Sequence, residues 1–274
     1  MLKDITLGQF FPGNSPVHKI DPRMKIIITV IYIVAVFFAK NIYSFSLLIL
    51  FSFLVTAMSR IKASVILKGF KPILFIVAFT AIINLFWTNG EVPVVDFWVI
   101  QIYPEGIITA LFMIIRILSL VMGTSLLLSY TTSPIALTDA LERLMKPLKY
   151  IRVPVHEFSM MMTIALRFIP TLIEETEKII NAQKARGADF ESGNILHRAK
   201  ALIPILIPLF ISAFRRADEL AVAMECRCYH GGEGRTKLKI LHLTFSDFLW
   251  LVFTLVFTVG VFFINYLPTS ISLK

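Results

Sequence analysis

Five long apolar runs separate the polar parts of this chain of 274 residues. A helix that crosses a bilayer needs about 20 apolar residues, with about 17 as the lower bound. The runs are residues 24–39, 42–58, 72–86, 107–128 and 245–266. The third run has 15 residues and reaches spanning length only if Trp87 and its neighbours lie at the membrane interface. Because lipid cannot satisfy irregular backbone, the pattern predicts an all-α integral membrane protein with about five transmembrane helices.

The composition agrees with this fold class and limits the partners. Of all residues, 57% are hydrophobic and 16% are charged, whereas soluble domains carry about 25% charged residues. The net charge of +9 indicates membrane topology and contact with anionic lipid headgroups, so we expect no nucleic-acid partner. The two cysteines predict no disulfide framework, and the polar, turn-rich residues 1–23 predict no cleavable signal peptide.

Lysine and arginine are distributed unevenly along the chain. Basic residues precede the first run and follow the second, at Lys19, Arg23, Lys25, Arg60, Lys62, Lys68 and Lys71. Residues 87–106 contain acidic side chains but no Lys or Arg, and 16 of the 27 basic residues fall between 140 and 240. The positive-inside rule therefore predicts a cytoplasmic N-terminus, an external C-terminus and a large cytoplasmic insertion. We expect three parts: residues 1–130 with an N-terminal arm and four spans, residues 131–240 in the cytoplasm, and residues 241–274 with the last span.

The cytoplasmic insertion has the periodicity of amphipathic helices. Apolar residues recur at steps of three and four between Phe158 and Ile180, and charged residues lie off that stripe. A single helix over residues 153–185 would be about 50 Å long. Pro170 is expected to kink it, because proline lacks the backbone donor that a helix interior requires.

Two more helices are expected in the same insertion. One runs from about residue 197 to about residue 227, and its first half, residues 201–214, is apolar all round but too short to span. A shorter one begins after the cap-like Thr131-Thr132-Ser133-Pro134 and ends near Pro147. The insertion thus holds three cytoplasmic amphipathic helices.

Two arginines with small neighbours lie at the predicted ends of the two long helices. Ala185-Arg186-Gly187 ends the first, and Cys226-Arg227-Cys228 ends the second. Small neighbours let a partner surface approach the backbone, and the guanidinium offers a planar fork of donors to a carboxylate. An arginine near a helix C-terminus also complements the helix dipole without any partner. Because the pattern occurs twice in one insertion, we expect the two tripeptides to bind a soluble protein.

We assign no metal, cofactor or nucleotide site. Cys226 and Cys228 with His230 lack the second ligand pair of a structural zinc site, so small packing residues are the favoured interpretation. Residues 231–236 are rich in glycine but lack the Gly-Lys-Ser/Thr ending of a phosphate loop.

We also assign no catalytic site. Arg116 lies within the fourth apolar run, and we expect it to have a buried structural partner or to snorkel rather than to mark a substrate path. His156 with Glu157 and Arg167 is the best candidate for a titratable enzyme cluster, and it is weak. The main alternative function is a self-sufficient secondary transporter or channel, which should show inverted repeats and polar groups at the membrane midplane.

Several segments resemble one membrane-protein family over nearly the whole chain. Ile20-Asp21-Pro22-Arg23-Met24-Lys25 is similar to the Asp-Pro-Arg-x-Lys motif of the transmembrane T component of energy-coupling factor (ECF) transporters, the EcfT/CbiQ-like family. Further similar segments are residues 140–148, 165–170 with Glu174, 182–189 and 223–228. The family usually has Ala and Gly around the second arginine, where this chain has Cys226 and Cys228, so packing there is expected to differ.

The resemblance implies a scaffold with no chemistry of its own, hence not an enzyme and without cofactors. T components couple two cytoplasmic ABC-type ATPases to a membrane-embedded substrate-binding subunit, the S component, for uptake of vitamins or metal ions. The three cytoplasmic helices would be coupling helices, with Arg186 and Arg227 contacting the ATPases. The resemblance further implies a multi-pass protein of a prokaryotic cell membrane.

Overall fold

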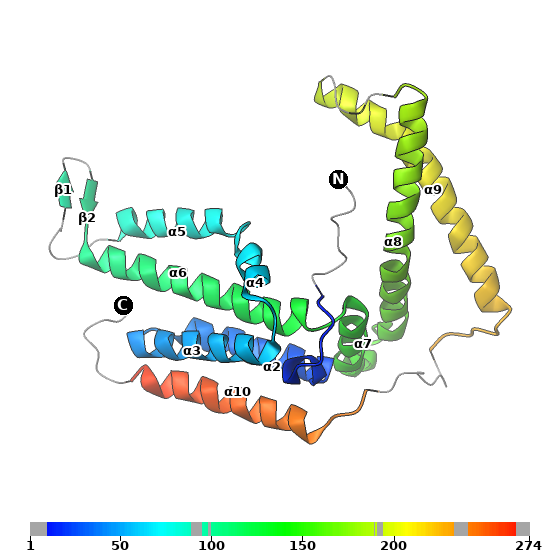
Figure 1. Ribbon diagram of the computed structural model, residues 1–274. Helices are drawn as coiled ribbons and strands as arrows, with labels where there is room; N and C mark the ends of the chain where they lie inside the picture. The colour runs from blue at the N-terminus through cyan, green and yellow to red at the C-terminus, as the bar shows by residue number, and fades with distance from the viewer. Residues whose placement is uncertain are drawn as a thin grey trace. The chain divides into compact units, whose positions relative to one another are not determined.

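The computed structural model describes residues 10–88, 95–97, 100–188, 190, 194–232 and 241–266, and nearly all of its regular structure is helical (Figure 1). The elements are α1 (Pro16–Lys19), α2 (Pro22–Phe38), α3 (Ile42–Ser59), α4 (Ala63–Phe70), α5 (Leu74–Trp87), β1 (Val95–Phe97), β2 (Ile100–Ile102), α6 (Pro104–Thr124), η2 (Ser125–Tyr130), α7 (Pro134–Leu144), η3 (Lys146–Ile151), α8 (Val155–Ala185), α9 (Ile195–Glu225) and α10 (Phe245–Ile264). η2 is a π-helix and η3 is a 3-10 helix. The all-α prediction omitted one small feature, the antiparallel pair β1 and β2, in which Val95 lies opposite Ile102.

Three helical segments are long and apolar enough to cross a membrane: α3, α10, and α6 continued by η2. The pair of α4 and α5 satisfies the same criteria only when taken together, and it is bent by 58° at the break between them. The short third apolar run therefore corresponds to a broken segment, because α5 alone has 14 residues. Helix α2 has 17 residues, which is about the lower bound for a span. Length and composition thus support three or four spans among the described residues, and five stays a prediction.

Capping residues explain where several of these helices begin. The carboxylate of Asp21 accepts a hydrogen bond from the backbone N–H of Arg23, and proline occupies the first position of α2. Thr244 and Asp247 form a capping box at the start of α10. The hydroxyl of Ser133 accepts from the N–H of Ala136 at 3.3 Å, which confirms the predicted start of α7. That helix ends at residue 144, earlier than expected, and η3 follows it.

The described residues separate into two compact units. The membrane unit comprises residues 10–137 and 241–266 and holds every candidate span. The inserted unit comprises the described residues from 138 to 232, which include most of α7 and all of η3, α8 and α9. The chain leaves the membrane unit within α7 and returns to it just before α10.

Aromatic side chains form the centre of the membrane unit. Phe51 of α3 stacks against Tyr32 of α2 and Phe257 of α10, with ring centroids 5.4 Å and 4.2 Å apart. The Tyr32 hydroxyl, which is fully buried, donates to the carbonyl of Ser119 at 2.8 Å and lies 3.0 Å from the hydroxyl of Ser52. A Cβ atom on Gly123 would overlap the Tyr32 ring, so this glycine permits the close approach of α6 and α2. The core therefore joins the four helices α2, α3, α6 and α10.

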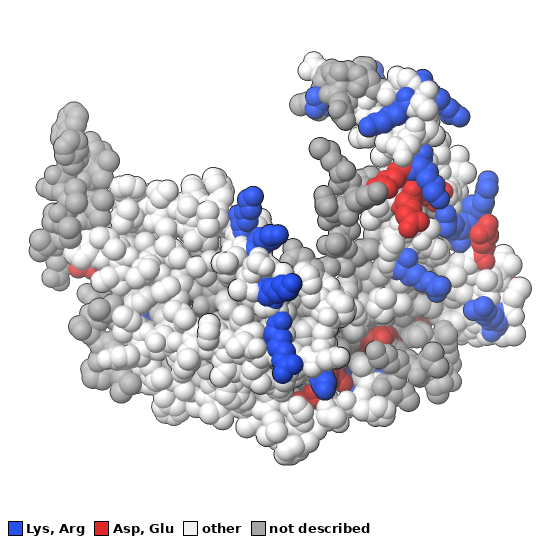
Figure 2. Space-filling view, in the orientation of Figure 1, with Lys and Arg blue, Asp and Glu red and all other residues white. Residues whose placement is uncertain are grey.

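The surface of the membrane unit is largely uncharged. Figure 2 shows a row of basic side chains beside α4 and an otherwise almost uncharged face over the neighbouring membrane helices. The exposed basic residues in this part of the chain are Arg60, Lys62, Lys68 and Lys71. Large apolar side chains such as Phe53, Phe75 and Trp87 are exposed on the same unit, as expected of helices whose outer faces contact lipid.

The inserted unit is built on α8 and α9, which pack against each other and have 31 residues each. The predicted bounds of both helices are confirmed to within about two residues. Helix α8 continues as one element through Pro170. Helix α9 likewise continues through Pro204 and Pro208.

Candidate partner-binding site

Helix α8 ends in a Schellman motif at the first arginine tripeptide. The N–H of Gly187 donates to the carbonyl of Lys184, and the N–H of Ala188 donates to the carbonyl of Gln183, both at 3.0 Å. This pair of bonds defines the motif. Gly187 has a φ of +86°, a left-handed conformation that glycine adopts without steric cost. Arg186 is the C-cap, between the last helical residue and the left-handed one.

Helix α9 ends in the same way at the second tripeptide. The N–H of Cys228 donates to the carbonyl of Glu225 at 2.8 Å, and the N–H of Tyr229 donates to the carbonyl of Met224 at 3.1 Å. Cys228 has a φ of +55°, where an L-residue other than glycine loses about 1 kcal/mol. Arg227 therefore holds the same position in its motif as Arg186 does in the first.

All six predicted site residues are exposed: Ala185, Arg186, Gly187, Cys226, Arg227 and Cys228. Neither guanidinium has a hydrogen-bond or ion-pair partner within the described ranges. A Cβ atom built on Gly187 would meet nothing within 4 Å. Both arginines are thus presented to the surroundings on helix ends whose backbone conformation is fixed by the Schellman bonds.

The two tripeptides lie at opposite ends of the paired stretch of α8 and α9, because Gln183 near the end of α8 contacts Pro204 while Met224 near the end of α9 lines a groove with Ile164. The first precedes the connection into α9, and the second follows the last turn of that helix. The stretch of α9 from Pro204 to Met224 is about 30 Å long. Two arginines separated by this distance suit two separate partner surfaces rather than one binding groove.

A polar bridge joins the middle of α8 to α9. The Nη2 atom of Arg216 lies 2.9 Å from Oε2 of Glu175, and the hydroxyl of Ser212 donates to the other carboxylate oxygen. The pKa of Glu175 is lowered, first by the Ser212 hydrogen bond and further by the nearby positive charge of Arg216. The bridge fixes the alignment of the two helices along their length.

A side chain of α8 also bonds to α9 at a carbonyl that lacks its usual helical donor. Pro208 has no N–H, so it cannot form the usual bond to the carbonyl of Pro204. The Nε2 atom of Gln183 donates to that carbonyl at 3.4 Å. The end of α8 next to Arg186 is therefore attached to the proline-containing half of α9.

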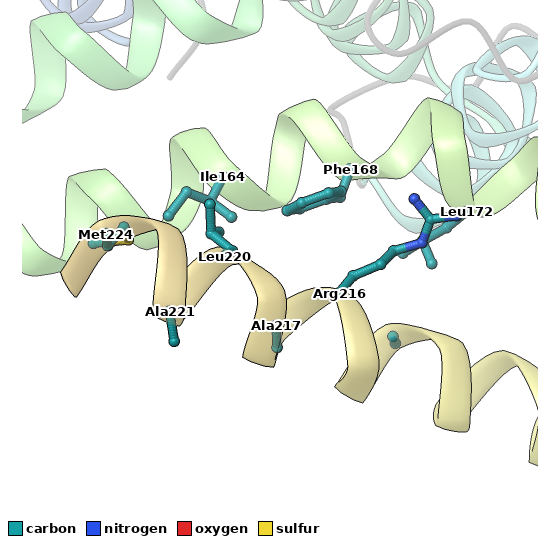
Figure 3. A pocket seen from close by; sticks show the side chains of 9 residues that line it. Ile164, Phe168, Leu172, Arg216, Ala217, Leu220, Ala221 and Met224 are labelled. Atoms are coloured by element: carbon teal, nitrogen blue, oxygen red, sulfur yellow. The ribbon is translucent and has the colours of Figure 1, made fainter. Parts of the chain in front are cut away.

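An apolar groove with a volume of about 260 Å³ lies between α8 and α9 (Figure 3). Its lining residues are Ile164, Phe168, Leu172, Ala213, Arg216, Ala217, Leu220, Ala221 and Met224. Met224 also contributes its carbonyl to the second Schellman motif. The groove thus runs along the helix pair as far as the turn that presents Arg227.

The first half of α9 exposes a continuous apolar surface. Its exposed side chains are Leu202, Ile203, Leu206, Ile207, Phe210, Ile211 and Phe214. Phe158, Met161 and Met162 at the start of α8 are exposed too, at the other end of the helix pair. Contiguous apolar surface of this kind marks a site of contact with protein or membrane.

The cysteine and histidine candidates do not come together as a metal site. Cys226 and Cys228 are free and exposed, and Nδ1 of His230 lies 2.8 Å from the carbonyl oxygen of Cys228. No three His, Cys, Asp or Glu side chains are grouped as metal ligands in the described part of the chain.

Arg116 has a structural partner, as expected. Its Nη2 atom donates to the carbonyl of Ala39 at 2.7 Å, and its guanidinium carbon lies 5.5 Å from the centre of the Phe45 ring. Ala39 is the C-cap residue of α2, so Arg116 satisfies an open carbonyl at a helix end.

His156 pairs with a residue that the sequence analysis did not connect to it. Its Nδ1 atom lies 3.1 Å from Oε1 of Glu142 on α7, and Ser159 donates to Oε2 of the same carboxylate at 2.7 Å. The structure shows no such bond from His156 to Glu157 or Arg167. The Glu142 contacts fasten α7 to the start of α8, and the sequence carried no signal for them.

Comparisons with known proteins agree with these features. The family model for CbiQ, described as cobalt transport protein, matches residues 13–238. The chain is 55% identical over 266 residues to the energy-coupling factor transporter transmembrane protein EcfT of Ruminiclostridium cellulolyticum, covering 97% of this chain and 99% of the relative. The protein of the same name from Bacillus subtilis is 44% identical over 265 residues, which is 97% of this chain and 100% of the relative. This chain belongs to the EcfT/CbiQ family.

The family match includes the candidate binding residues. It extends over both arginine tripeptides and over the Asp-Pro-Arg-x-Lys segment. The EcfT protein of Clostridium kluyveri is also similar, with 54% identity over 250 residues that cover 91% of this chain and 92% of the relative. Relatives with this name are transmembrane components of energy-coupling factor transporters, so the chain is a membrane transporter component with apolar spans.

Proposed function

We propose that this protein is the coupling subunit of an ECF-type importer. In this function it binds two cytoplasmic ABC-type ATPases through its arginine tripeptides and transmits their ATP-driven motion to a membrane-embedded S component. The chemistry of ATP hydrolysis then belongs to the partners. The names of the relatives support this assignment.

The observation that carries the proposal is the repeated presentation of an exposed arginine. Arg186 and Arg227 occupy the same position in the two Schellman motifs that end α8 and α9. A guanidinium next to a left-handed turn can enter a carboxylate-lined groove without steric conflict from its neighbours. Two such helix ends in one unit suit two copies, or two variants, of one ATPase fold.

The exposed apolar surface of α8 and α9 supports contact with the S component. Exposed side chains of the two helices include Met161 and Met162 of α8 and Phe210 of α9. Methionine is unbranched and adapts its shape to different neighbours. A surface of this composition suits a hydrophobic partner that changes its orientation during transport.

The orientation of the chain is also part of the proposal. The inserted unit faces the cytoplasm of a prokaryotic cell, with the N-terminus cytoplasmic and the C-terminus external. The exposed basic row beside α4 supports this, because Lys62 and Lys68 follow a candidate span and belong on the cytoplasmic side. The transported compounds would be vitamins or metal ions, chosen by the S component.

Purification of the tagged protein from gently solubilised native membranes tests the assignment. We expect mass spectrometry to identify ABC-type ATPases and one or more small hydrophobic proteins in the same preparation. Recovery of this chain alone in several detergents would refute the coupling function and favour a self-sufficient transporter.

A further inference from the structure

Both points at which the chain passes between the two units are bonded to the first turn of α2. The chain leaves the membrane unit after residue 137 and returns to it at residue 241. Thr131 and Thr132 lie just before the departure, and Leu241 begins the return. The Asp-Pro-Arg-x-Lys segment contacts all three residues through separate side chains.

Lys25 holds the departing segment. Its ammonium group donates to the carbonyl of Thr131 at 2.8 Å and to the hydroxyls of Thr131 and Thr132, each at 3.1 Å. The side chain is 1% exposed. Burying an ammonium group costs free energy unless its donors are hydrogen-bonded. Separating these three oxygens from Lys25 is therefore unfavourable.

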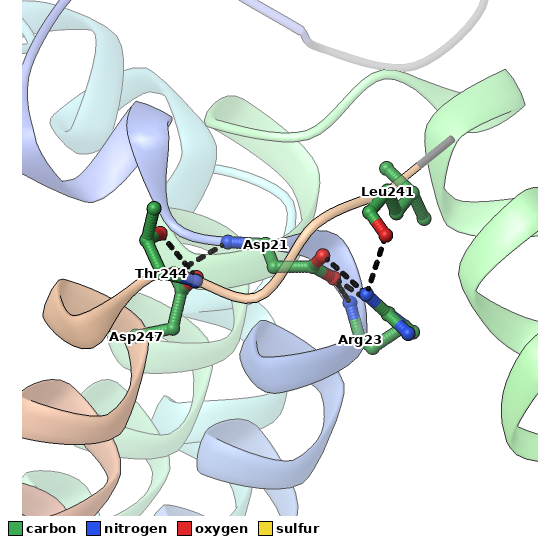
Figure 4. Close-up of polar contacts among 5 residues, drawn as sticks. All are labelled: Asp21, Arg23, Leu241, Thr244 and Asp247. Carbon is green, nitrogen blue, oxygen red and sulfur yellow. Dashed lines mark hydrogen bonds and ion pairs between the residues drawn. The ribbon is translucent and has the colours of Figure 1, made fainter. Parts of the chain in front are cut away.

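Arg23 holds the returning segment (Figure 4). Its Nε and Nη2 atoms donate to the two carboxylate oxygens of Asp21 at 3.1 Å and 2.9 Å. Nη2 also donates to the backbone carbonyl of Leu241 at 3.1 Å. The Asp21 carboxylate therefore orients the guanidinium, and the guanidinium binds the main chain of the return.

Asp247 joins the starts of α2 and α10. Its Oδ1 atom accepts from the N–H of Asp21, and its Oδ2 atom accepts from the N–H of Thr244, both at 2.8 Å. The Thr244 hydroxyl donates to Oδ2 at 2.6 Å. The Asp247 residue is 1% exposed. Such a buried and satisfied polar network resists rearrangement, because each broken bond leaves an unpaired group.

We propose that Asp21, Arg23, Lys25 and Asp247 form a clamp that transmits displacement of the inserted unit to α2 and α10. The inference rests on the proposed coupling function. Two of its bonds end on backbone carbonyls, those of Thr131 and Leu241, and the main chain at these points is the covalent route between the units. The clamp residues are positioning residues: they bond to the chain's own connecting segments, and they keep these segments from shifting against α2 and α10 when the inserted unit moves.

Hydrogen-exchange mass spectrometry on the complex purified from native membranes tests the clamp, with MgADP–vanadate compared with nucleotide-free protein. In the wild type, we expect nucleotide to change exchange in α8 and α9 and also in α2 and α10. In Arg23→Gln, the change in α8 and α9 should persist, whereas the change in α2 and α10 should fall about fivefold. Arg23→Lys should restore part of it, because lysine keeps the charge but lacks the fork. Lys19→Gln, which removes an exposed cation nearby, should match the wild type.

The possible outcomes separate the clamp from the proposed function. No nucleotide effect in α8 and α9 of the wild type would refute the coupling function and the clamp with it. An effect confined to α8 and α9 in the wild type, or a full response of α2 and α10 in Arg23→Gln, would refute the clamp alone. If Arg23→Gln fails to assemble, the same measurement is made on Thr132→Val and Thr132→Ser. The clamp requires that Thr132→Val loses the nucleotide-dependent change in α2 and α10 and that Thr132→Ser keeps it.

Discussion

Arg216 on α9 and Glu175 on α8 form an ion pair of 2.9 Å that crosses the interface of the two longest helices. The same carboxylate accepts a hydrogen bond from Ser212. Because the bridge contains an ionisable carboxylate whose pKa is lowered, it makes the stability of the helix pair depend on pH.

The first prediction concerns that pH dependence. The pKa of Glu175 is lowered in the folded protein by the Ser212 hydrogen bond and by Arg216, so ionised Glu175 stabilises the helix pair. The stabilisation is fully present above the unfolded pKa of about 4.3 and is lost as pH falls through the lowered folded pKa. We expect Glu175→Gln to lower stability at pH 7 by less than about 1 kcal/mol, since the pair is partly exposed.

Thermal unfolding of the purified full-length protein, followed by circular dichroism at pH 7 and near pH 4, measures this effect. The difference between wild type and Glu175→Gln should shrink at the lower pH. Glu174→Gln removes an exposed neighbouring carboxylate and serves as the control. An equal effect of both substitutions would contradict the assigned role of the bridge.

The second prediction concerns the left-handed residues of the two Schellman motifs. Gly187→Ala should destabilise the end of α8 by about 1 kcal/mol, because at a φ of +86° the added Cβ crowds the residue's own backbone, although it meets no other atom within 4 Å. Cys228→Gly should instead stabilise the end of α9 by about 0.5 kcal/mol, since the strain exceeds the added chain entropy. Denaturant titration of the two variants checks the opposite signs, and a loss of stability in Cys228→Gly would argue against the conformation described.

The third prediction concerns the candidate partner contacts. Arg186→Glu or Arg227→Glu should weaken ATPase binding by about 3 kcal/mol or more, which is about a hundredfold or more in Kd. The isolated protein should remain folded in the membrane. Arg215→Glu reverses an exposed charge on α9 outside both tripeptides, and this variant should bind the ATPases normally. Co-purification of ATPases with each variant gives the result, and normal assembly of both tripeptide variants would show that docking occurs elsewhere.

The fourth prediction tests the core of the membrane unit. A methyl group added at Gly123 would overlap the ring of Tyr32, so Gly123→Ala should destabilise the protein by about 1–3 kcal/mol through overpacking. Gly260→Ala is a matched control on α10, because its Cβ would lie 3.9 Å from Leu47 in ordinary contact. Thermal stability in detergent distinguishes the two variants. Equal stabilities would contradict the close packing of α6 against α2.

Local sequence signals predicted the ends of helices better than the contacts between them. Proline at the start of α7 and glycine after α8 act within one turn, so their effects can be read from neighbouring residues. Cys228 adopts a glycine-like conformation that its own chemistry disfavours, and no local rule predicts it. The break between α4 and α5 shortened the third apolar run, but its bend of 58° depends on packing.

Long-range pairing was beyond the sequence. Lys25 meets Thr131 across a separation of 106 residues, and the resemblance that identified its segment gave no partner for it. Glu142 meets His156 across 14 residues that include η3 and the turn after it. Many residues in the chain could accept such hydrogen bonds, and tertiary packing determines which of them does. A pattern of residue types does not reveal that packing.

The second arginine tripeptide can be labelled chemically in the unmodified protein. The chain has two cysteines in total, and both flank Arg227 as exposed free thiols. A maleimide added to the unmodified protein should therefore alkylate only the turn that presents this arginine. The rate of alkylation of this chain should fall when a partner covers that turn. Partner binding at Arg227 can thus be followed in native membranes without a substitution.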